Sequence, residues 1–362
     1  MKKFHLLLVF VFAFFLNGWS QADFTITGSG FGDFKQVTLK VFNPSTLGYD
    51  SLQTNALAES GRFVFHTLFK TPNLYELSFD EKDFVHLSIE SPQPVSVRRE
   101  GTEISISGSL SSQQIIDFQK RNEQLQAKHF GQLKVEMDKA MQENNQTRMD
   151  AIQKEAETAI QNFLVEFRAL IVGLGASPAA YFAMQYSDFN KELDFLENRL
   201  EVLKKEAPNM PTTLALEKQV YQAKTTGIGK TPPDFQAVDR NGQKRALSDF
   251  RGQIILLDFW AYWCRACRVE NPKLVRVYQQ FKDKGVTILS ISQRSTQEQW
   301  EDAIEKDGIG IWSQVLDKDN EISALYSISS LPQNLLLDQT GKVIAKNITA
   351  AELEVWLRRI LE

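Results

Sequence analysis

Two cysteines, Cys264 and Cys267, stand three residues apart in this chain, and no other cysteine is present. The apolar run over residues 254–260 predicts a buried strand, and residues 264–284 predict a helix, so the pair lies where a strand ends and a helix begins. A thiolate at a helix N-terminus faces free backbone N–H groups and the positive end of the dipole, which lower its pKa below the ~8.5 of a free thiol. One sulfur can then attack a disulfide, and the other can release the product.

Three other roles for a cysteine pair are weaker interpretations. A structural disulfide closing so small a loop would constrain the unfolded chain little. A zinc site lacks further ligands, because the histidines left after removal of a leader, His66, His86 and His129, lie far away in sequence. Haem attachment requires a histidine directly after the second cysteine, where Arg268 stands. Thiol-disulfide exchange therefore remains the main hypothesis, and it requires no metal and no bound cofactor.

Length and composition limit the number of domains and the class of protein. At about 150 residues per domain, 362 residues allow two or three domains. The net charge is −4, with 43% hydrophobic and 24% charged residues, which is typical of globular proteins. These values argue against a broadly disordered chain and against a strongly basic nucleic-acid-binding protein.

The first 20 residues have the layout of a secretory signal. Lys2 and Lys3 precede an apolar run over residues 6–16, and Gly18 and Ser20 supply the small residues of a cleavage site after Ser20. A buried N-terminal strand or helix is the alternative. The run is about half the ~20 residues that a membrane-spanning helix needs, and no later stretch is apolar enough to span a membrane. We expect a mature protein without a transmembrane segment, soluble and periplasmic or otherwise extracytoplasmic, where a disulfide persists.

The pattern of apolar residues divides the rest of the chain into three parts. Residues 23–108 alternate apolar and polar side chains between turn residues, which predicts an antiparallel β module. Residues 109–224 show apolar positions three or four apart, which predicts helices, with a stop at Leu174 and Gly175 and an N-cap at Ser177. Their charges alternate in sign and predict a solvated face rather than a coiled-coil surface.

The third part, residues 225–362, begins with a linker rich in glycine and proline over residues 225–233. Strands and helices then alternate, which predicts a three-layer α/β domain. The expected strands cover residues 254–260, 286–292, 314–316, 334–337 and 342–346, and the expected helices cover residues 264–284, 297–306, 322–326 and 350–361.

The segment from Leu257 to Pro272 reads Leu-Asp-Phe-Trp-Ala-Tyr-Trp-Cys-Arg-Ala-Cys-Arg-Val-Glu-Asn-Pro. It resembles the active-site segment of the thioredoxin superfamily, in its extracytoplasmic TlpA/ResA-like branch. The resemblance runs from about Gly227 to the C-terminus and implies a thioredoxin-like α/β domain, with a central mixed sheet flanked by helices. The β-rich module and the helical insert before it are similar to modules that precede TlpA-like domains, which is a weaker match.

The resemblance also implies roles for individual residues. Cys264 would be the exposed attacking thiol and Cys267 the buried resolving thiol. Asp258, on the strand beneath them, matches a buried carboxylate that helps to move the proton of the resolving thiol, and burial would raise its pKa toward neutrality. An aspartate merely hydrogen-bonded at a strand end is the alternative.

Further residues would bind the substrate. Leu331 and Pro332 match the cis-proline loop, which pairs with an incoming substrate strand; an ordinary turn proline is the alternative. Trp263 is expected to be partly exposed to partners. Between the cysteines lie Ala266 and Arg265, whose charge would favour the Cys264 thiolate unless it is a solvated surface residue.

These residues predict a thiol-disulfide oxidoreductase that acts on proteins containing disulfides. The family implies a reductase recharged by a membrane-bound thiol electron donor. One alternative is a binding or scaffold protein whose N-terminal modules recognise a partner that the thioredoxin-like domain docks. A peroxidase of the peroxiredoxin type fits poorly, because Tyr262 and Trp263 stand where those enzymes have a threonine shortly before a lone cysteine.

Overall fold

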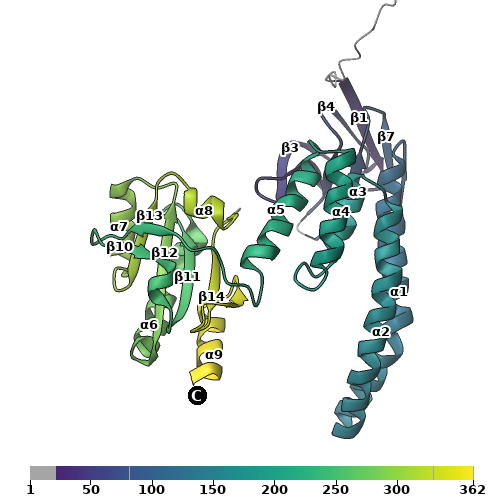
Figure 1. Ribbon diagram of the computed structural model, residues 1–362. Coiled ribbons are helices and arrows are strands. Elements are labelled where there is room, and N and C mark those ends of the chain that lie inside the picture. The colour runs from purple at the N-terminus through teal and green to yellow at the C-terminus, as the bar shows by residue number, and fades with distance from the viewer. Residues whose placement is uncertain (1–21, 81, 329, 362) are drawn as a thin grey trace, which may run out of the picture.

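The computed structural model describes residues 22–80, 82–328 and 330–361. The expected signal segment, residues 1–20, lies outside these ranges. Figure 1 shows a β-rich module at the N-terminal end, a set of helices that includes one long hairpin, and a separate α/β domain at the C-terminal end. Within the described residues, no helix combines the length and the apolar character needed to cross a membrane.

Two four-stranded sheets form the N-terminal module, with strand orders β4-β1-β7-β8 and β3-β2-β5-β6. Their neighbours are antiparallel except for β1 and β7, which are parallel. A shared core fills the space between them, with Ile26 and Phe65 from one sheet and Leu39 and Leu77 from the other. The strands are β1 (Ala22–Ser29), β2 (Gln36–Asn43), β3 (Gly48–Ala56), β4 (Phe63–Phe69), β5 (Asn73–Ser78), β6 (Phe84–Ile89), β7 (Val95–Glu100) and β8 (Glu103–Ser107).

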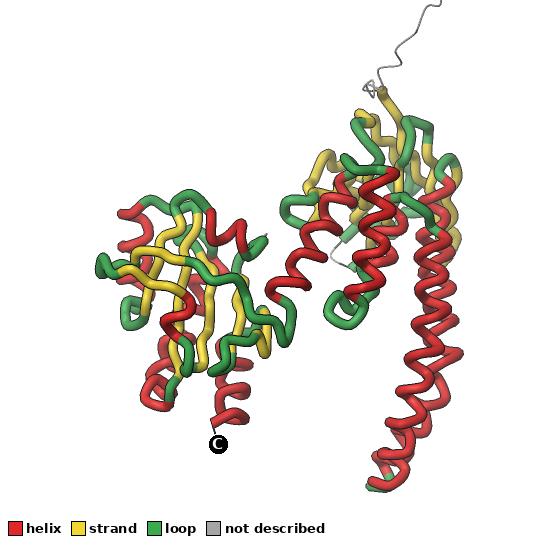
Figure 2. The backbone as a smooth tube through the Cα atoms, viewed as in Figure 1, coloured by secondary structure: helices red, strands yellow, loops and turns green. Residues whose placement is uncertain are grey.

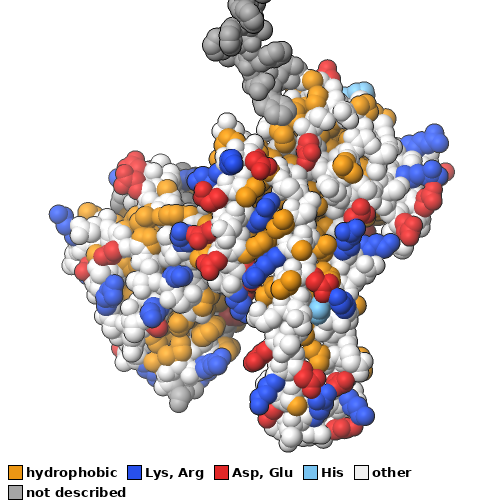
Figure 3. All heavy atoms as spheres, turned by 45° about the vertical axis from the view of Figure 1, so that its right-hand side comes forward, with side chains coloured by type: hydrophobic (Ala, Val, Ile, Leu, Met, Phe, Trp, Pro, Cys, Tyr) orange, Lys and Arg blue, Asp and Glu red, His pale blue; other side chains and the backbone are white. Residues whose placement is uncertain are grey.

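The helical part has five helices in the described residues: α1 (Leu110–Gln142), α2 (Gln146–Gly173), α3 (Pro178–Met184), α4 (Leu193–Glu206) and α5 (Pro211–Thr226). Side chains cap the first three, because Ser109, Asn145 and Ser177 each accept a backbone N–H of the first turn. Helices α1 and α2 form a hairpin that extends away from the β-rich module (Figure 1). Lys, Arg, Asp and Glu side chains mingle over its far end, as expected for a solvated surface (Figure 3).

The C-terminal domain is built on a mixed five-stranded sheet of order β13-β12-β11-β14-β15. Strands β11, β12 and β13 are parallel, and β14 runs antiparallel to β11 and β15. This confirms the expected thioredoxin-like sheet with flanking helices; in Figure 2 the strands of this domain are yellow and the helices around them are red. The strands are β9 (Gln236–Val238), β10 (Lys244–Ala246), β11 (Ile254–Trp260), β12 (Val286–Gln293), β13 (Ser313–Asp317), β14 (Gln333–Leu337) and β15 (Val343–Lys346).

Alternating side chains of β11 belong to two separate hydrophobic cores, one on each face of the sheet. Leu256 and Trp260 pack with α6 (Arg265–Phe281), α7 (Gln297–Asp307) and α9 (Ala350–Leu361). Leu257 and Phe259 pack on the opposite face against α8 (Glu321–Leu325) and the 3-10 helix η1 (Leu247–Phe250). A second 3-10 helix, η2 (Lys282–Lys284), follows α6. Because every residue of β11 is buried, this central strand fixes the place where α6 begins.

Helix α5 connects the helical part to the C-terminal domain. The Gln222 amide donates a hydrogen bond to the carbonyl of Ser327, in the loop before β14. Beyond the end of α5, the backbone N–H of Ile228 donates to the side chain of Asn190 at 3.3 Å. The first bond places the end of α5 against the loop before β14, and the second connects the start of the linker back to the helical part.

Candidate active site

The two cysteines form a disulfide at the first turn of α6, with an S–S distance of 2.01 Å and a Cα–Cα distance of 5.3 Å. Cys264 is the N-cap residue, and its sulfur accepts the backbone N–H of Cys267 at 3.2 Å. The expectation that Cys264 is exposed is wrong for this disulfide form, in which Cys264 is 5% exposed and Cys267 2% exposed. The reason is that both sulfurs belong to the apolar core between α6 and the sheet.

Asp258 lies in the middle of β11 and is almost completely buried. Burial raises the pKa of its carboxyl to about 7, although a hydrogen bond from Ser290 acts in the opposite direction. This agrees with the direction of the pKa shift that the resemblance implies for a buried carboxylate at this position. A carboxyl with a pKa near 7 can exchange protons at neutral pH.

A cavity of about 90 Å³ joins this carboxyl to the second cysteine. Asp258 and Cys267 both line it, together with Pro332 from the loop before β14. The cavity has room for water and is lined by several polar groups, so a proton can pass between the Cys267 sulfur and the carboxyl. The structure thus brings together three residues that the sequence places on a strand, a helix and a distant loop.

Glu270 also lines this cavity, although no role for it could be predicted from the sequence. Its carboxylate accepts the Lys273 ammonium at 2.6 Å and the backbone N–H of Ala350 at 3.1 Å. Burial favours its protonated form, but these two hydrogen bonds hold the pKa of Glu270 below its usual value. Glu270 therefore ties α6 to the first residue of α9 and places a negative charge beside the cavity.

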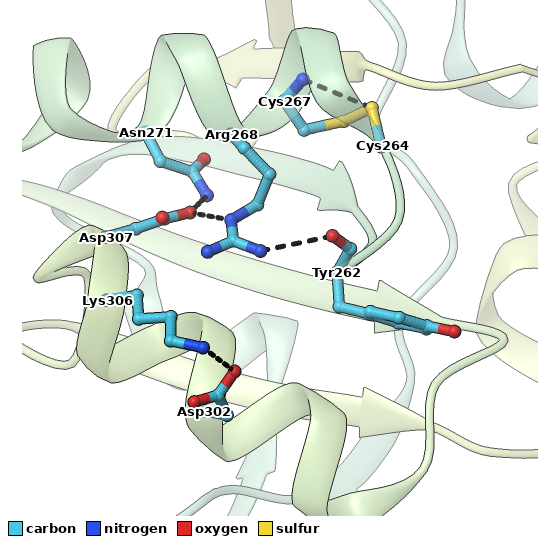
Figure 4. A network of polar contacts seen from close by, with 8 residues as sticks. All are labelled: Tyr262, Cys264, Cys267, Arg268, Asn271, Asp302, Lys306 and Asp307. Atoms are coloured by element: carbon cyan, nitrogen blue, oxygen red, sulfur yellow. Dashed lines mark hydrogen bonds and ion pairs between the residues drawn. A yellow bond between two sulfur atoms is a disulfide. The ribbon is translucent and has the colours of Figure 1, made fainter.

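A second polar network fixes the loop before the cysteines, as Figure 4 shows. The Arg268 guanidinium donates from Nε to the Asp307 carboxylate and from Nη1 to the Tyr262 carbonyl, the latter at 3.2 Å. The Asn271 amide donates to the same carboxylate at 2.8 Å. Through these bonds, the end of α7 holds both the first turns of α6 and the loop that leads into Cys264.

We expect Arg268→Ala to lower the free energy of unfolding by about 2–3 kcal/mol, because it leaves the buried Asp307 carboxylate without its cation. Arg268→Lys should restore only part of the loss, since an ammonium cannot donate in two fixed directions to Asp307 and to the Tyr262 carbonyl. Urea unfolding of the oxidised protein measures both changes. An alanine variant as stable as the wild type would show that the network contributes nothing to the fold.

The residues expected to bind substrate surround the disulfide. Trp263 is 49% exposed, and its indole N–H donates to the carbonyl of Arg294 at 3.3 Å. Arg265 and Ala266 are exposed on the first turn of α6. The peptide bond between Leu331 and Pro332 is cis, as the resemblance implies, with Leu331 half-buried and Pro332 exposed. Their roles in substrate binding remain predictions.

Comparison with known proteins identifies relatives of the C-terminal part. Residues 228–346 match the family model described as the AhpC/TSA family. The thiol-disulfide oxidoreductase ResA of Bacillus cereus is 33% identical over 136 residues, which cover 37% of this chain and 78% of that protein. ResA of Bacillus subtilis is 32% identical over 135 residues, which cover 36% of this chain and 75% of that protein.

Two solved structures are also similar to this part of the chain. The thioredoxin domain of a thiol-disulfide oxidoreductase from Bacteroides vulgatus is 34% identical with a TM-score of 0.36, and the match covers 37% of this chain and 98% of that one. A thiol-disulfide oxidoreductase from Bacteroides fragilis is 36% identical with a TM-score of 0.34, and the match covers 36% of this chain and 100% of that one.

Proposed function

Since the chain belongs to the thioredoxin superfamily, as a ResA-like thiol-disulfide oxidoreductase, we propose that it reduces the disulfides of partner proteins outside the cytoplasm. The observation that carries this proposal is the cavity that Cys267 shares with the buried Asp258 carboxyl. A purely structural disulfide has no need of a titratable group next to one of its sulfurs. A thiol that must lose a proton at neutral pH does.

The reaction begins with the reduced protein. The Cys264 thiolate attacks one sulfur of the partner's disulfide, so that a mixed disulfide forms and the partner's other sulfur leaves as a thiolate. Cys267 then passes its proton through the cavity to the Asp258 carboxylate and attacks the Cys264 sulfur. This step releases the partner's second thiolate and closes the Cys264–Cys267 disulfide, and two electrons have moved to the partner.

The same scheme explains the surface around the pair. Trp263, Arg265 and Ala266, together with Leu331 and Pro332, would contact the partner chain while the mixed disulfide exists. The oxidised protein must then be recharged by an external dithiol, for which we propose a membrane-bound thiol electron donor. The secretory layout of residues 1–20 supports this location outside the cytoplasm.

Insulin reduction in the presence of dithiothreitol tests the proposal with the mature chain. We expect catalytic amounts of the protein to accelerate reduction well above the rate with dithiothreitol alone. A glutathione titration then gives the direction of electron flow, since a potential near −270 mV supports a reductase and one near −120 mV an oxidant. No acceleration would contradict an exchange enzyme, and rapid consumption of hydrogen peroxide instead would favour a peroxidase.

A further inference from the structure

We infer that Ser290, held in place by the Trp312 indole, is a positioning residue that sets the pH range in which Asp258 can take the proton of Cys267. The inference rests on the proposed function, because it concerns the proton that leaves the resolving thiol. It assigns a task to two residues that come from outside the cysteine segment.

The contacts of Ser290 define the direction of its hydroxyl. Ser290 is directly opposite Asp258 in the register between β12 and β11 and is completely buried. Its oxygen accepts the indole N–H of Trp312 at 2.9 Å, and its hydroxyl donates to Asp258 Oδ2 at 3.1 Å. Because a serine has a single hydroxyl hydrogen, the chain from indole to hydroxyl to carboxyl runs in one direction.

This direction favours the ionised carboxyl. A hydrogen bond to a carboxylate is stronger than one to the neutral acid, so the hydroxyl stabilises the form of Asp258 that can accept a proton. The indole N–H also polarises the hydroxyl and strengthens its donation. Ser290 therefore counteracts part of the burial that raises the pKa of Asp258.

The other described neighbours of Asp258 do not supply an equivalent donor. Asn334 is opposite Asp258 on β14, but its side chain is already paired with Ile348. The Asn334 Oδ1 atom accepts the backbone N–H of Ile348 at 2.9 Å, and its Nδ2 donates to the Ile348 carbonyl at 2.8 Å. Besides Asp258 itself, the ionisable residues that line the cavity are Cys267 and Glu270, both on α6.

Among the described residues, the other segments near the cavity bring no unpaired charge to the carboxyl. The segment between β15 and α9 contributes Asn347 and Thr349, which are uncharged. On the α7 side, the Asp307 carboxylate is paired with Arg268 and Asn271. Ser290 is therefore the described side chain that donates a hydrogen bond to the Asp258 carboxyl.

Replacing Ser290 with alanine should move the Asp258 titration to higher pH. We expect its midpoint, followed by ¹³C NMR of the carboxyl in the oxidised protein, to rise by about one pH unit. The acidic limb of the pH profile for release of the partner from the mixed disulfide should move by the same amount. At pH 7 this slows release several-fold, and the rate recovers at high pH.

Three variants separate this role from a general effect on packing. Trp312→Phe keeps the aromatic ring but removes the donor, and should shift the midpoint in the same direction by a smaller amount. Ser292→Ala, two residues along β12, removes a buried hydroxyl that contacts Ser295 and should leave the midpoint unchanged. Adding Ser290→Ala to Asp258→Asn should not alter the pH profile further, because the carboxyl through which Ser290 acts is already absent.

Unchanged midpoints in Ser290→Ala and Trp312→Phe would overturn the inference, and so would a shift of equal size in Ser292→Ala. The NMR titration needs no enzymatic activity. A protein that catalyses no disulfide exchange would therefore contradict the proposed function, but the titration midpoint of Asp258 could still be measured. An active enzyme whose Asp258 midpoint does not move in Ser290→Ala would contradict only the role of Ser290.

Discussion

Replacing Asp258 with asparagine is expected to raise the free energy of unfolding of the oxidised protein by about 4 kcal/mol at pH 8. Burial raises the pKa of this carboxyl to about 7 in the folded protein, against 3.8 for an ordinary aspartate. Below pH 4 the group is protonated in both the folded and the unfolded chain and does not affect stability. Between pH 4 and 7 the unfolded chain loses the proton and the folded protein retains it, so wild-type stability falls as pH rises.

The asparagine variant should not show this fall, so the two stability curves should meet near pH 4 and separate toward pH 8. Urea unfolding at a series of pH values measures the difference, with the disulfide kept intact in both proteins. Asp317→Asn is a matched control, because Asp317 is equally buried but accepts the backbone N–H groups of Ile322 and Ser323. That variant should lose stability. Parallel pH curves for the wild type and Asp258→Asn would show that Asp258 titrates as an ordinary aspartate.

The gain in stability should come with a loss of activity. Asparagine keeps the shape of the side chain and can still accept the Ser290 hydroxyl, but it cannot take a proton from Cys267. General-base catalysis typically contributes about a hundredfold or more, so release of the partner at neutral pH should slow by about that factor. The carboxyl would then be a group retained for function at the expense of stability.

Replacing either cysteine should stop turnover, but with different products. Cys267→Ser leaves Cys264 able to attack, so the mixed disulfide with the partner should accumulate to nearly one per chain. Cys264→Ser removes the attacking sulfur, and no such adduct should form. Non-reducing electrophoresis after acid quenching separates the two outcomes, and insulin reduction should fall to the rate with dithiothreitol alone in both variants.

This asymmetry does not follow from exposure, because both sulfurs are nearly buried in the disulfide form. It follows from position: Cys264 is the N-cap residue of α6, and Cys267 lines the cavity with Asp258. An adduct that accumulates in Cys264→Ser and not in Cys267→Ser would reverse the two roles.

Local sequence was enough to predict the cysteine pair at the junction of β11 and α6, since a run of apolar residues followed by a helical period defines that junction. The burial of Asp258 was implied by the resemblance, and it agrees with the position of this residue within an apolar strand. The exposure of Cys264 was predicted wrongly, because the position of a sulfur relative to the core depends on the packing of α6 against the sheet.

Contacts between residues far apart in the sequence could not be predicted from local sequence patterns. Ser290 lies on β12 and Trp312 just before β13. The bond from Ser290 to Asp258 and the bond from Trp312 to Ser290 both depend on how neighbouring strands pair. Strand β3 shows no local signal, because most of its residues are polar and exposed and lack the alternation that marks a half-buried strand. The parallel pairing of β1 with β7 joins strands about 70 residues apart, and no local signal encodes that partner.

The disulfide in the first turn of α6 couples electron transfer to folding. Folding and reduction form a closed thermodynamic cycle, so any preference of the native structure for one redox state must reappear as a difference in unfolding free energy between the two states. Each 30 mV between the potentials of the folded and the unfolded chain corresponds to about 1.4 kcal/mol of that difference. The oxidised molecule, which has just delivered its electrons, therefore differs in stability from the reduced one unless the two potentials coincide, and the donor that reduces it again also changes its resistance to unfolding.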